Sequence, residues 1–199
     1  MKKTYFMRTL NLNLRLILFS ILTFIIKVFL DFMSASFEKS SLLPLFKLSN
    51  SISAFSHFTF ELSVGLFSLV ILLTTLELIN RFKYDSWINY FKSIKQTFNL
   101  RRFMGQSEHS EKIVETQKVT ISNPINDKFN RAVRKSCVDL RNDKILVFIK
   151  IPHTQQTQKI LKELEAQIKE EISSQNPEYI FSNFERVHNQ LWLQGTKRK

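Results

Sequence analysis

The stretch LILFSILTFIIKVFLDF, residues 16–32, decides how this 199-residue chain is organised. A bilayer core of about 30 Å needs about 20 helical residues at 1.5 Å each. The apolar run 12–32 has this length, and its charged residues, Arg15, Lys27 and Asp31, lie near its ends. Lys27 and Asp31 are four residues apart, so they share a helix face and can pair. We therefore predict a first membrane span over about residues 12–32.

A cleaved signal peptide is the alternative interpretation of the same stretch. Its apolar core would be residues 16–26, and the small residues of MSAS would provide a cleavage site at Ala35. The charges of Lys27 and Asp31 fit this pattern poorly. Both interpretations leave the C-terminal domain in the cytoplasm.

A second apolar run, LSVGLFSLVILLTTL, occupies residues 62–76 between Glu61 and Glu77. No charge interrupts it, so with its flanks it predicts a second span over about residues 59–79. Residues 1–80 would then form a transmembrane two-helix hairpin.

Basic residues orient this predicted hairpin. Four precede the first run, six follow the second, and the loop between the runs has only Lys39 and Lys47, offset by Glu38. The positive-inside rule then predicts a multi-pass protein of the cell membrane with both termini in the cytoplasm. This antiparallel arrangement would place Arg15 near Glu77 and Lys27 near Glu61, so we expect two interhelix ion pairs. In the alternative, each of these charges simply reaches water.

Residues 81–104 read as a basic amphipathic helix next to the membrane. Four apolar residues recur at helical spacing: Trp87, Phe91, Ile94 and Phe98. Four basic residues lie beside or opposite this apolar stripe: Lys92, Lys95, Arg101 and Arg102. Such a helix usually lies in the headgroup plane of an anionic bilayer. The alternative is a linker helix packed on the soluble domain.

The remainder predicts a small cytoplasmic two-layer α/β domain. The polar segment 105–112 is expected to be a hinge, and residues 113–199 the domain. Periodicity indicates the order β-α-β-α-β-β, with strands at 119–122 and 144–152 and a helix at 155–174. Right-handed crossovers would place both helices on one face of the sheet.

Two boundaries in this domain have specific signals. Asn123 and Pro124 open the first helix as cap and first-turn residue. His188 and Asn189 predict a two-residue turn between the last two strands. The buried face of the first helix is expected to be Ile125, Phe129, Ala132, Val133, Cys137 and Leu140.

Composition argues against several enzyme classes. The chain has three scattered glycines, so it cannot build a phosphate-cradling glycine loop. The one cysteine, Cys137, excludes an internal disulfide, and none of the four histidines has metal-ligand spacing to another histidine or to Cys137. Arg102 and His109 have the spacing found in HEPN ribonucleases, but they flank Gly105. We predict no catalytic residue, no metal and no cofactor.

Positive charge is the remaining signal for a partner. Residues 1–104 hold 13 Lys and Arg against 5 Asp and Glu, and residues 105–199 hold 16 against 12. Most of the excess thus lies beside the apolar runs, which favours anionic lipid as its cause. In the domain, the outer surface of the first helix is expected to bind a partner through Lys128, Arg131, Arg134, Lys135 and Arg141. Nucleic acid is an alternative partner for this surface, and self-association stays open.

The layout of residues 1–104 resembles the membrane anchor of type IV coupling proteins of conjugative elements, without their ATPase motifs. The residue usage, rich in Phe, Ile, Lys and Asn, is typical of low-GC bacterial genomes. We therefore expect a non-enzymatic adaptor that recruits a cytoplasmic protein or nucleoprotein to the membrane, as in a mobile-element transfer machine. The alternative is a membrane effector whose domain senses a ligand and whose hairpin oligomerises to perturb the bilayer.

Overall fold

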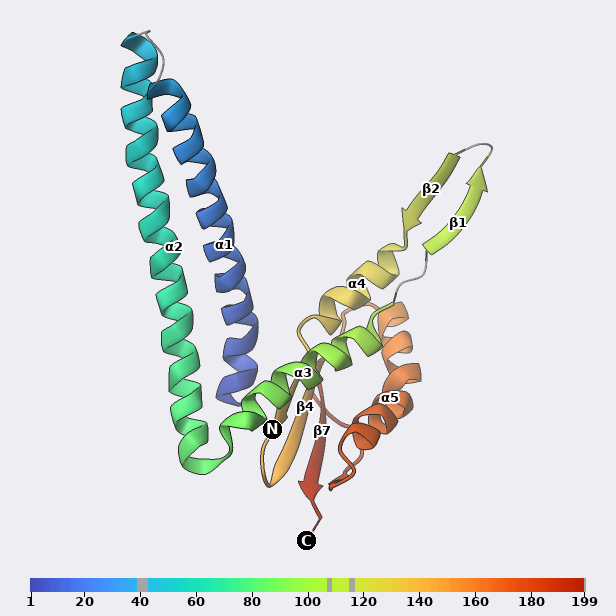
Figure 1. The fold of residues 1–199 in the computed structure, drawn as a ribbon. Coiled ribbons are helices and arrows are strands. Elements are labelled where there is room, and N and C mark those ends of the chain that lie inside the picture. Colours follow the sequence, from blue (N-terminus) through green and yellow to red (C-terminus); the bar gives the residue numbers. More distant parts are fainter. Residues whose placement is uncertain (39–42, 107–108, 115–116, 199) are drawn as a thin grey trace. The chain divides into compact units, whose positions relative to one another are not determined.

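The computed structural model describes residues 1–38, 43–106, 109–114 and 117–198. The chain divides into two compact units (Figure 1). We call Arg8–Ile79 the hairpin unit, and Met1–Met7 together with Asn80–Lys199 the sheet unit. The first seven residues therefore belong with the C-terminal domain, although the whole hairpin unit separates them along the chain.

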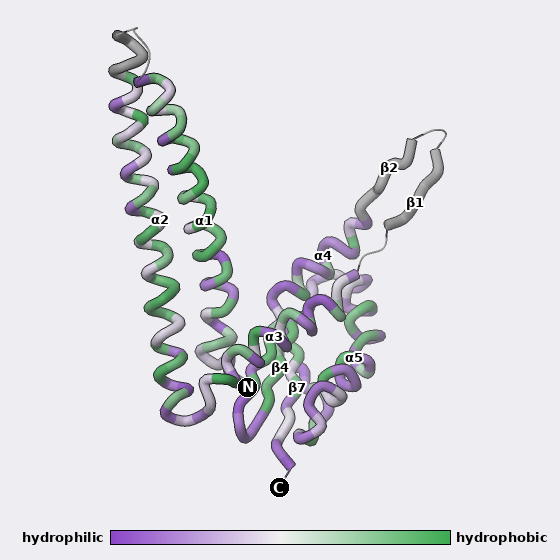
Figure 2. Tube along the Cα trace, viewed as in Figure 1, coloured by the Kyte–Doolittle hydropathy of each residue, from purple (hydrophilic) through white to green (hydrophobic). Residues whose placement is uncertain are grey.

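Two long helices, α1 (Tyr5–Glu38) and α2 (Leu43–Tyr84), build the hairpin unit. Each has an 18-residue window of high mean hydropathy, 2.3 in α1 and 2.2 in α2, and these windows are only 6% and 17% buried. Apolar residues follow both helices along their length (Figure 2). Large side chains such as Phe29 and Phe32 are 61% and 70% exposed. Both helices are therefore long and apolar enough to span a membrane, and their large apolar side chains are mostly not covered by protein.

Serine side chains join α1 to α2. Ser20 donates its hydroxyl to the Ser63 carbonyl at 3.0 Å, and Ser63 donates to the Ser20 carbonyl at 2.9 Å. Ser34 and Ser49 repeat this reciprocal geometry at 3.1 and 3.0 Å. Such small side chains let two helix backbones approach closely.

Residues of α1 and α2 that are buried or that form interhelix hydrogen bonds recur every seven residues. On α1 the series is Asn13, Ser20, Lys27 and Ser34, and on α2 it is Ser49, Ser56, Ser63, Val70 and Glu77. Between the two serine pairs, Ser56 donates to the Lys27 carbonyl at 3.4 Å and to the Asp31 carboxylate. A repeat of seven is the period of a coiled coil, in which one seam of each helix stays in contact with its partner. We call these nine residues the heptad seam.

The sheet unit mixes helices with antiparallel strands. Its elements are α3 (Trp87–Met104), β1 (His109–Val114), β2 (Gln117–Ser122), α4 (Pro124–Val133), β3 (Cys137–Leu140), β4 (Lys144–Lys150), α5 (Gln155–Gln175), β5 (Tyr179–Phe181), β6 (Glu185–Val187) and β7 (Gln190–Lys197). The five-stranded sheet has the order β3-β4-β7-β5, and β6 also pairs with β7. All of these pairs are antiparallel.

This topology corrects the predicted β-α-β-α-β-β order with its right-handed crossovers. The first predicted helix ends at Val133, and Cys137–Leu140 is the strand β3. Cys137 and Leu140 continue the three- and four-residue spacing of Phe129 and Val133, which is why periodicity placed them on the helix. All four residues of β3 are buried, because both faces of the strand are covered.

The N-terminal strand prediction is confirmed in position but not in pairing. Residues 119–122 lie in β2, which pairs antiparallel with β1 as a separate two-stranded sheet. Residues 109–112, expected within the hinge, are the start of β1. Residues 107 and 108 of that expected hinge lie outside the described part of the chain.

The C-terminal strands follow the sequence more closely. The expected strand 144–152 is β4, and the expected helix 155–174 is α5. His188 has φ 54°, which a tight hairpin turn between β6 and β7 requires. The segment expected to be one strand before this turn is two short ones, β5 and β6, which both pair with β7.

The sheet has an apolar core on one face and the chain's N-terminus on the other. The core packs α4 and α5 against alternate strand residues, including Val147, Ile149 and Leu193. On the opposite face, the rings of Phe148 and Trp192 are in tilted contact, with centroids 5.2 Å apart, and are almost fully buried. The Lys3 amino group lies 3.8 Å from the Phe148 ring centroid, so the N-terminal segment contributes to this cover.

Candidate functional site

Helix α3 covers the outer edge of the sheet with hydroxyl groups. The backbone N–H groups of Leu140 and Val138 donate to the hydroxyls of Ser93 and Thr97, at 2.9 and 3.0 Å. Four helical residues rise about 6 Å and two strand residues about 6.8 Å, so the two spacings run nearly in step. The unpaired edge of β3 is thereby closed, which removes a surface that could pair with another strand.

A buried arginine anchors the same region. Arg81 is 1% exposed and forms ion pairs with Asp139 and, at 3.5 Å, with Asp85. Its guanidinium lies 5.2 Å from the Phe6 ring centroid and 5.8 Å from that of Tyr90. Because an unpaired buried charge is very costly, these groups hold residues 1–7, α3 and β3 together. The arrangement is structural, since every charged member is paired inside the fold.

The predicted membrane face of α3 is exposed in the sheet unit. Trp87, Phe91 and Phe98 are 54%, 55% and 46% exposed, and Ile94 is partly buried. Polar residues are instead prominent on the side that meets β3. One face of α3 therefore packs on the domain, as the alternative interpretation expects, whereas its aromatic face is exposed.

Most basic residues of α3 are exposed, but one of them contacts the start of β3. Lys92, Lys95 and Arg102 are exposed. Arg101 instead donates through Nε to the Ser136 carbonyl at 2.9 Å and lies 3.7 Å from the Cys137 sulfur. Burial lowers the pKa of Arg101 and raises the pKa of the Cys137 thiol. Cys137 is thus a buried thiol that favours its neutral form.

Three of the five residues predicted to bind a partner surround one pocket. Lys128, Arg131 and Lys135 line a cavity of about 280 Å³ together with Lys150 and His153. Its floor contains apolar groups and the first turn of α5: Ala132, Ile151, Pro152, Thr154 and Thr157. None of the described residues that line this cavity, which we call the basic pocket, carries a carboxylate. It can attract an anionic group without competition from its own walls.

Two predicted members lie elsewhere. Arg134 is the exposed residue at the C-terminal cap of α4. Arg141 follows β3, not the helix, and its Nε lies 3.3 Å from the Asp139 carboxylate. Sequence reasoning missed Lys150 and His153, which come from the end of β4 and the loop after it. A clue in the sequence was that both residues lie just before the predicted helix 155–174.

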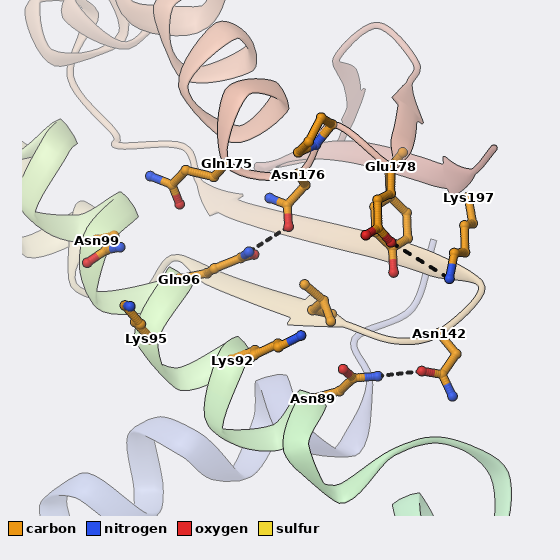
Figure 3. Close-up of a pocket in the computed structure, with 13 residues that line it drawn as sticks. Asn89, Lys92, Lys95, Gln96, Asn99, Asn142, Gln175, Asn176, Glu178 and Lys197 are labelled. Carbon is orange, nitrogen blue, oxygen red and sulfur yellow. Dashed lines mark hydrogen bonds and ion pairs between the residues drawn. The ribbon is translucent and has the colours of Figure 1, made fainter.

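A second, larger cleft lies between α3 and the C-terminal end of α5 (Figure 3). Its volume is about 560 Å³, and its lining combines three lysines with six amide side chains: Lys92, Lys95, Lys197, Asn89, Gln96, Asn99, Asn142, Gln175 and Asn176. Glu178 is the one carboxylate among the described residues of its lining, and it lies 3.8 Å from the Lys197 amino group. We call this the amide cleft.

Tyr179 closes one wall of the amide cleft. Its hydroxyl donates to the Arg141 carbonyl at 2.8 Å. Burial, reinforced by Glu178 and other nearby carboxylates, raises the pKa of Tyr179. The tyrosine therefore acts here as a neutral donor that fixes the wall.

The predicted interhelix ion pairs of the hairpin unit, Arg15 with Glu77 and Lys27 with Glu61, stay a prediction. Lys27 forms its ion pair with Asp31, one turn along α1, as their spacing suggested. Arg15 and Glu61 are exposed, whereas Glu77 is 1% exposed. Among the described residues the helices are joined by hydroxyl and amide groups of the heptad seam, including a contact from Asn13 to Thr74 at 3.4 Å.

Side chains for metal or nucleophilic chemistry do not converge in the described part of the chain. Within residues 1–38, 43–106, 109–114 and 117–198, no three His, Cys, Asp or Glu side chains are grouped as a metal site requires. His109 begins strand β1 and Arg102 lies in α3, so the HEPN-like pair does not share one helix. The chain matches no family model, no curated protein and no solved structure. Its function is therefore argued from the geometry of the two units.

Proposed function

We propose that this protein is a membrane-anchored adaptor, whose hairpin unit crosses the lipid twice and whose sheet unit recruits an acidic partner at the inner membrane face. The observation that carries the proposal is the inverted composition of the hairpin unit. Its seam contains serines such as Ser20, Ser56 and Ser63, while its large apolar side chains point outward. In water this arrangement would expose a large apolar surface; in lipid it is favourable.

The chain's N-terminus supports placing both ends on one side. Lys3 and Phe6 contact Phe148, Tyr90 and the buried Arg81 of the sheet unit. A cleaved signal peptide would remove these contacts and uncover the aromatic face of the sheet. An uncleaved first helix and an even number of crossings agree with this packing, and the basic flanks favour the cytoplasm.

The aromatic face of α3 supplies a second contact with the bilayer. Trp87, Phe91 and Phe98 are exposed together, with Lys95 and Arg102 beside them. Aromatic rings at headgroup level with flanking lysines are typical of interfacial helices. This contact would hold the sheet unit against an anionic surface.

The basic pocket is the proposed recruitment site. Lys128 and Arg131 on α4 and Lys135 just after it line the pocket together with Lys150 at the end of β4 and His153 in the following loop, so two parts of the chain can contact one anionic group. An acidic segment of a cytoplasmic protein, alone or within a nucleoprotein complex, has the matching chemistry. A transfer machine of a mobile element is one setting in which such an adaptor would act. Tethering raises the local concentration of the partner without catalysis.

The experiment combines topology with capture. A reporter fused after Lys199 should be active only in the cytoplasm, and the intact chain should resist extraction by alkaline carbonate. Crosslinking from membranes should then yield a partner with the wild-type chain. The triple variant K128E/R131E/K135E should lose it at least about tenfold, because two or three favourable charge contacts become repulsive.

The matched control is K159E/K162E/R186E, which reverses the same number of exposed charges elsewhere on the sheet unit. Capture by this control should stay within about twofold of the wild type. An external reporter would reject the topology, and equal capture by both triple variants would reject the basic pocket as the recruitment site.

A further inference from the structure

The amide cleft carries an uncompensated positive charge. Of its three lysines, Lys197 lies near Glu178, the one carboxylate of the lining. Lys92 and Lys95 are exposed on α3, and neither has an ion-pair partner among the described residues. Two free ammonium groups one turn apart match a phosphate better than a neutral ligand.

The amides of the cleft are held in defined positions. Asn89 donates to Asp85 at 2.8 Å and to Asn142 at 2.9 Å. Gln96 donates to Asn176 at 2.6 Å, while Oε1 of Gln96 is buried without a hydrogen-bond partner among the described residues (Figure 3). A buried acceptor of this kind is costly unless a donor reaches it. A ligand hydroxyl group can be that donor once the Gln96 amide turns toward the cleft that it lines.

The cleft also adjoins the aromatic face of α3. At 100° per residue, Lys95 and Asn99 lie on the helix next to the stripe of Trp87, Phe91 and Phe98. Gln96 lies farther round, toward the sheet. A surface that receives the aromatic stripe would therefore lie beside the mouth of the cleft.

We propose that the amide cleft binds a phosphate ester that carries free hydroxyl groups, with Lys92 and Lys95 on the phosphate and Gln96 on a hydroxyl. Two sources have this chemistry: the headgroup of a lipid such as phosphatidylglycerol, and a soluble compound such as glycerol 3-phosphate. The lipid source rests on the proposed membrane function, because it requires the aromatic stripe to enter the bilayer. The soluble source does not.

The test uses the full-length chain in a neutral detergent. Native mass spectrometry measures the retention of phosphatidylglycerol and of phosphatidylcholine, and calorimetry measures the binding of glycerol 3-phosphate and of inorganic phosphate. We expect preferential retention of phosphatidylglycerol and weaker binding of glycerol 3-phosphate. The variant K92Q/K95Q should lower both affinities about tenfold, while the control K162Q/R186Q should stay within about twofold.

A second variant separates hydroxyl recognition from charge. Gln96→Leu should weaken glycerol 3-phosphate several-fold and leave inorganic phosphate unchanged, since only the former supplies a hydroxyl donor. Binding of glycerol 3-phosphate without preference for phosphatidylglycerol would retain the phosphate-ester site and reject its lipid source. No binding by either ligand, or equal effects of K92Q/K95Q and its control, would overturn the proposal.

Carbonate extraction of the same variants distinguishes this failure from failure of the anchor. A chain that stays in the membrane but binds neither ligand would refute the cleft assignment while leaving the hairpin proposal intact. A chain released by carbonate would refute the anchor and, with it, the lipid source.

Discussion

The hairpin unit and the sheet unit distribute the same kinds of residue in opposite ways. In the sheet unit, aliphatic and aromatic residues such as Phe129, Val147 and Leu193 are buried around α4 and α5. In the hairpin unit, residues such as Leu18 and Phe29 are 63% and 61% exposed, while serines are buried. The difference shows that apolar content alone does not define a core. What matters is whether the apolar groups have protein to pack against.

The two units also join their elements through different side chains. The sheet unit buries Arg81 completely, because two carboxylates and two aromatic rings surround it. At its serine positions, the heptad seam of the hairpin unit uses neutral hydroxyls, which satisfy carbonyls without a full charge. The following predictions test this contrast, beginning with the largest expected effect.

Removing Arg81 should destabilise the sheet unit most. Arg81→Leu leaves the carboxylate of Asp139 buried without its main partner, at a cost of about 3–5 kcal/mol. Hydrogen-exchange protection of the β3 and β4 amides measures this loss. The double variant Arg81→Leu/Asp139→Leu should recover at least half of it, and a double variant as unstable as the single one would contradict the ion-pair explanation.

Truncating one phenylalanine in each unit should have very different effects on stability. Phe129→Ala opens a cavity in the sheet unit and should cost about 3 kcal/mol in unfolding free energy. Phe29→Ala removes an exposed ring from the hairpin unit and should cost less than about 1 kcal/mol in detergent. Denaturant unfolding followed by hydrogen exchange in each unit gives both free-energy changes. Similar losses of stability at the two positions would contradict the contrast between buried and exposed apolar groups.

Enlarging the heptad seam should force α1 and α2 apart. Ser63→Leu should cost about 1–3 kcal/mol, whereas Ser68→Leu, one turn away on the exposed side, should be nearly neutral. The readout is disulfide formation between cysteines introduced at Ser34 and Ser49. The native Cys137 is buried with a raised pKa and should stay unreactive as an internal control.

The expected disulfide yield follows from the seam geometry. The pair Ser34→Cys/Ser49→Cys should crosslink, because these residues already exchange hydrogen bonds. Ser63→Leu should reduce that yield severalfold, and Ser68→Leu should not. Efficient crosslinking between Ser34→Cys and Ser56→Cys, one heptad out of register, would reject the seam.

The smallest expected effect is a pH dependence of the folding stability of the sheet unit. Burial raises the pKa of Glu165 on α5 above its ordinary value, although Lys162 and Arg186 oppose this. The folded state therefore holds this proton more tightly than the unfolded state. The resulting stability is present below the ordinary pKa and is lost as the pH rises through the raised one.

Glu165→Gln should remove this slope. Stability of wild type and variant, compared from pH 4 to pH 7 by hydrogen exchange, should converge at low pH and favour the variant slightly at neutral pH. If the stability of the variant relative to the wild type fell between pH 4 and pH 7, the direction of the pKa shift assigned to Glu165 would be wrong.

Much of the layout was predictable from local pattern. Two runs of about 20 apolar residues indicate long helices whatever their surroundings, because length and hydropathy are properties of the segment itself. Asn123 and Pro124 start α4 as predicted, with the Asn123 side chain accepting from the Ile125 N–H at 3.0 Å. The β6–β7 turn at His188 and Asn189 was likewise encoded locally. Lys128, Arg131 and Lys135 were identified from their helical spacing in the sequence, although α4 ends at Val133 and Lys135 follows it.

Contacts between distant segments could not be obtained in this way. Cys137 to Leu140 have helical spacing, and only pairing with β4 and cover by α3 make them a strand. Lys150 and His153 reach the basic pocket because β4 ends beside α4, which no local pattern encodes. The seam of Ser20, Ser34, Ser49 and Ser63 has a visible period of seven, but serines become informative only when two helices bring them face to face.

The sequence by itself determined that the chain has two long apolar helices followed by a basic domain of helices and strands. Tertiary structure alone decided that residues 1–7 complete the C-terminal domain, that the sheet is antiparallel, and that serine hydroxyls join the long helices. The physical reason is that hydropathy and capping act within about one turn or one strand. Burial, hydrogen-bond pairing and charge compensation depend on residues tens of positions apart.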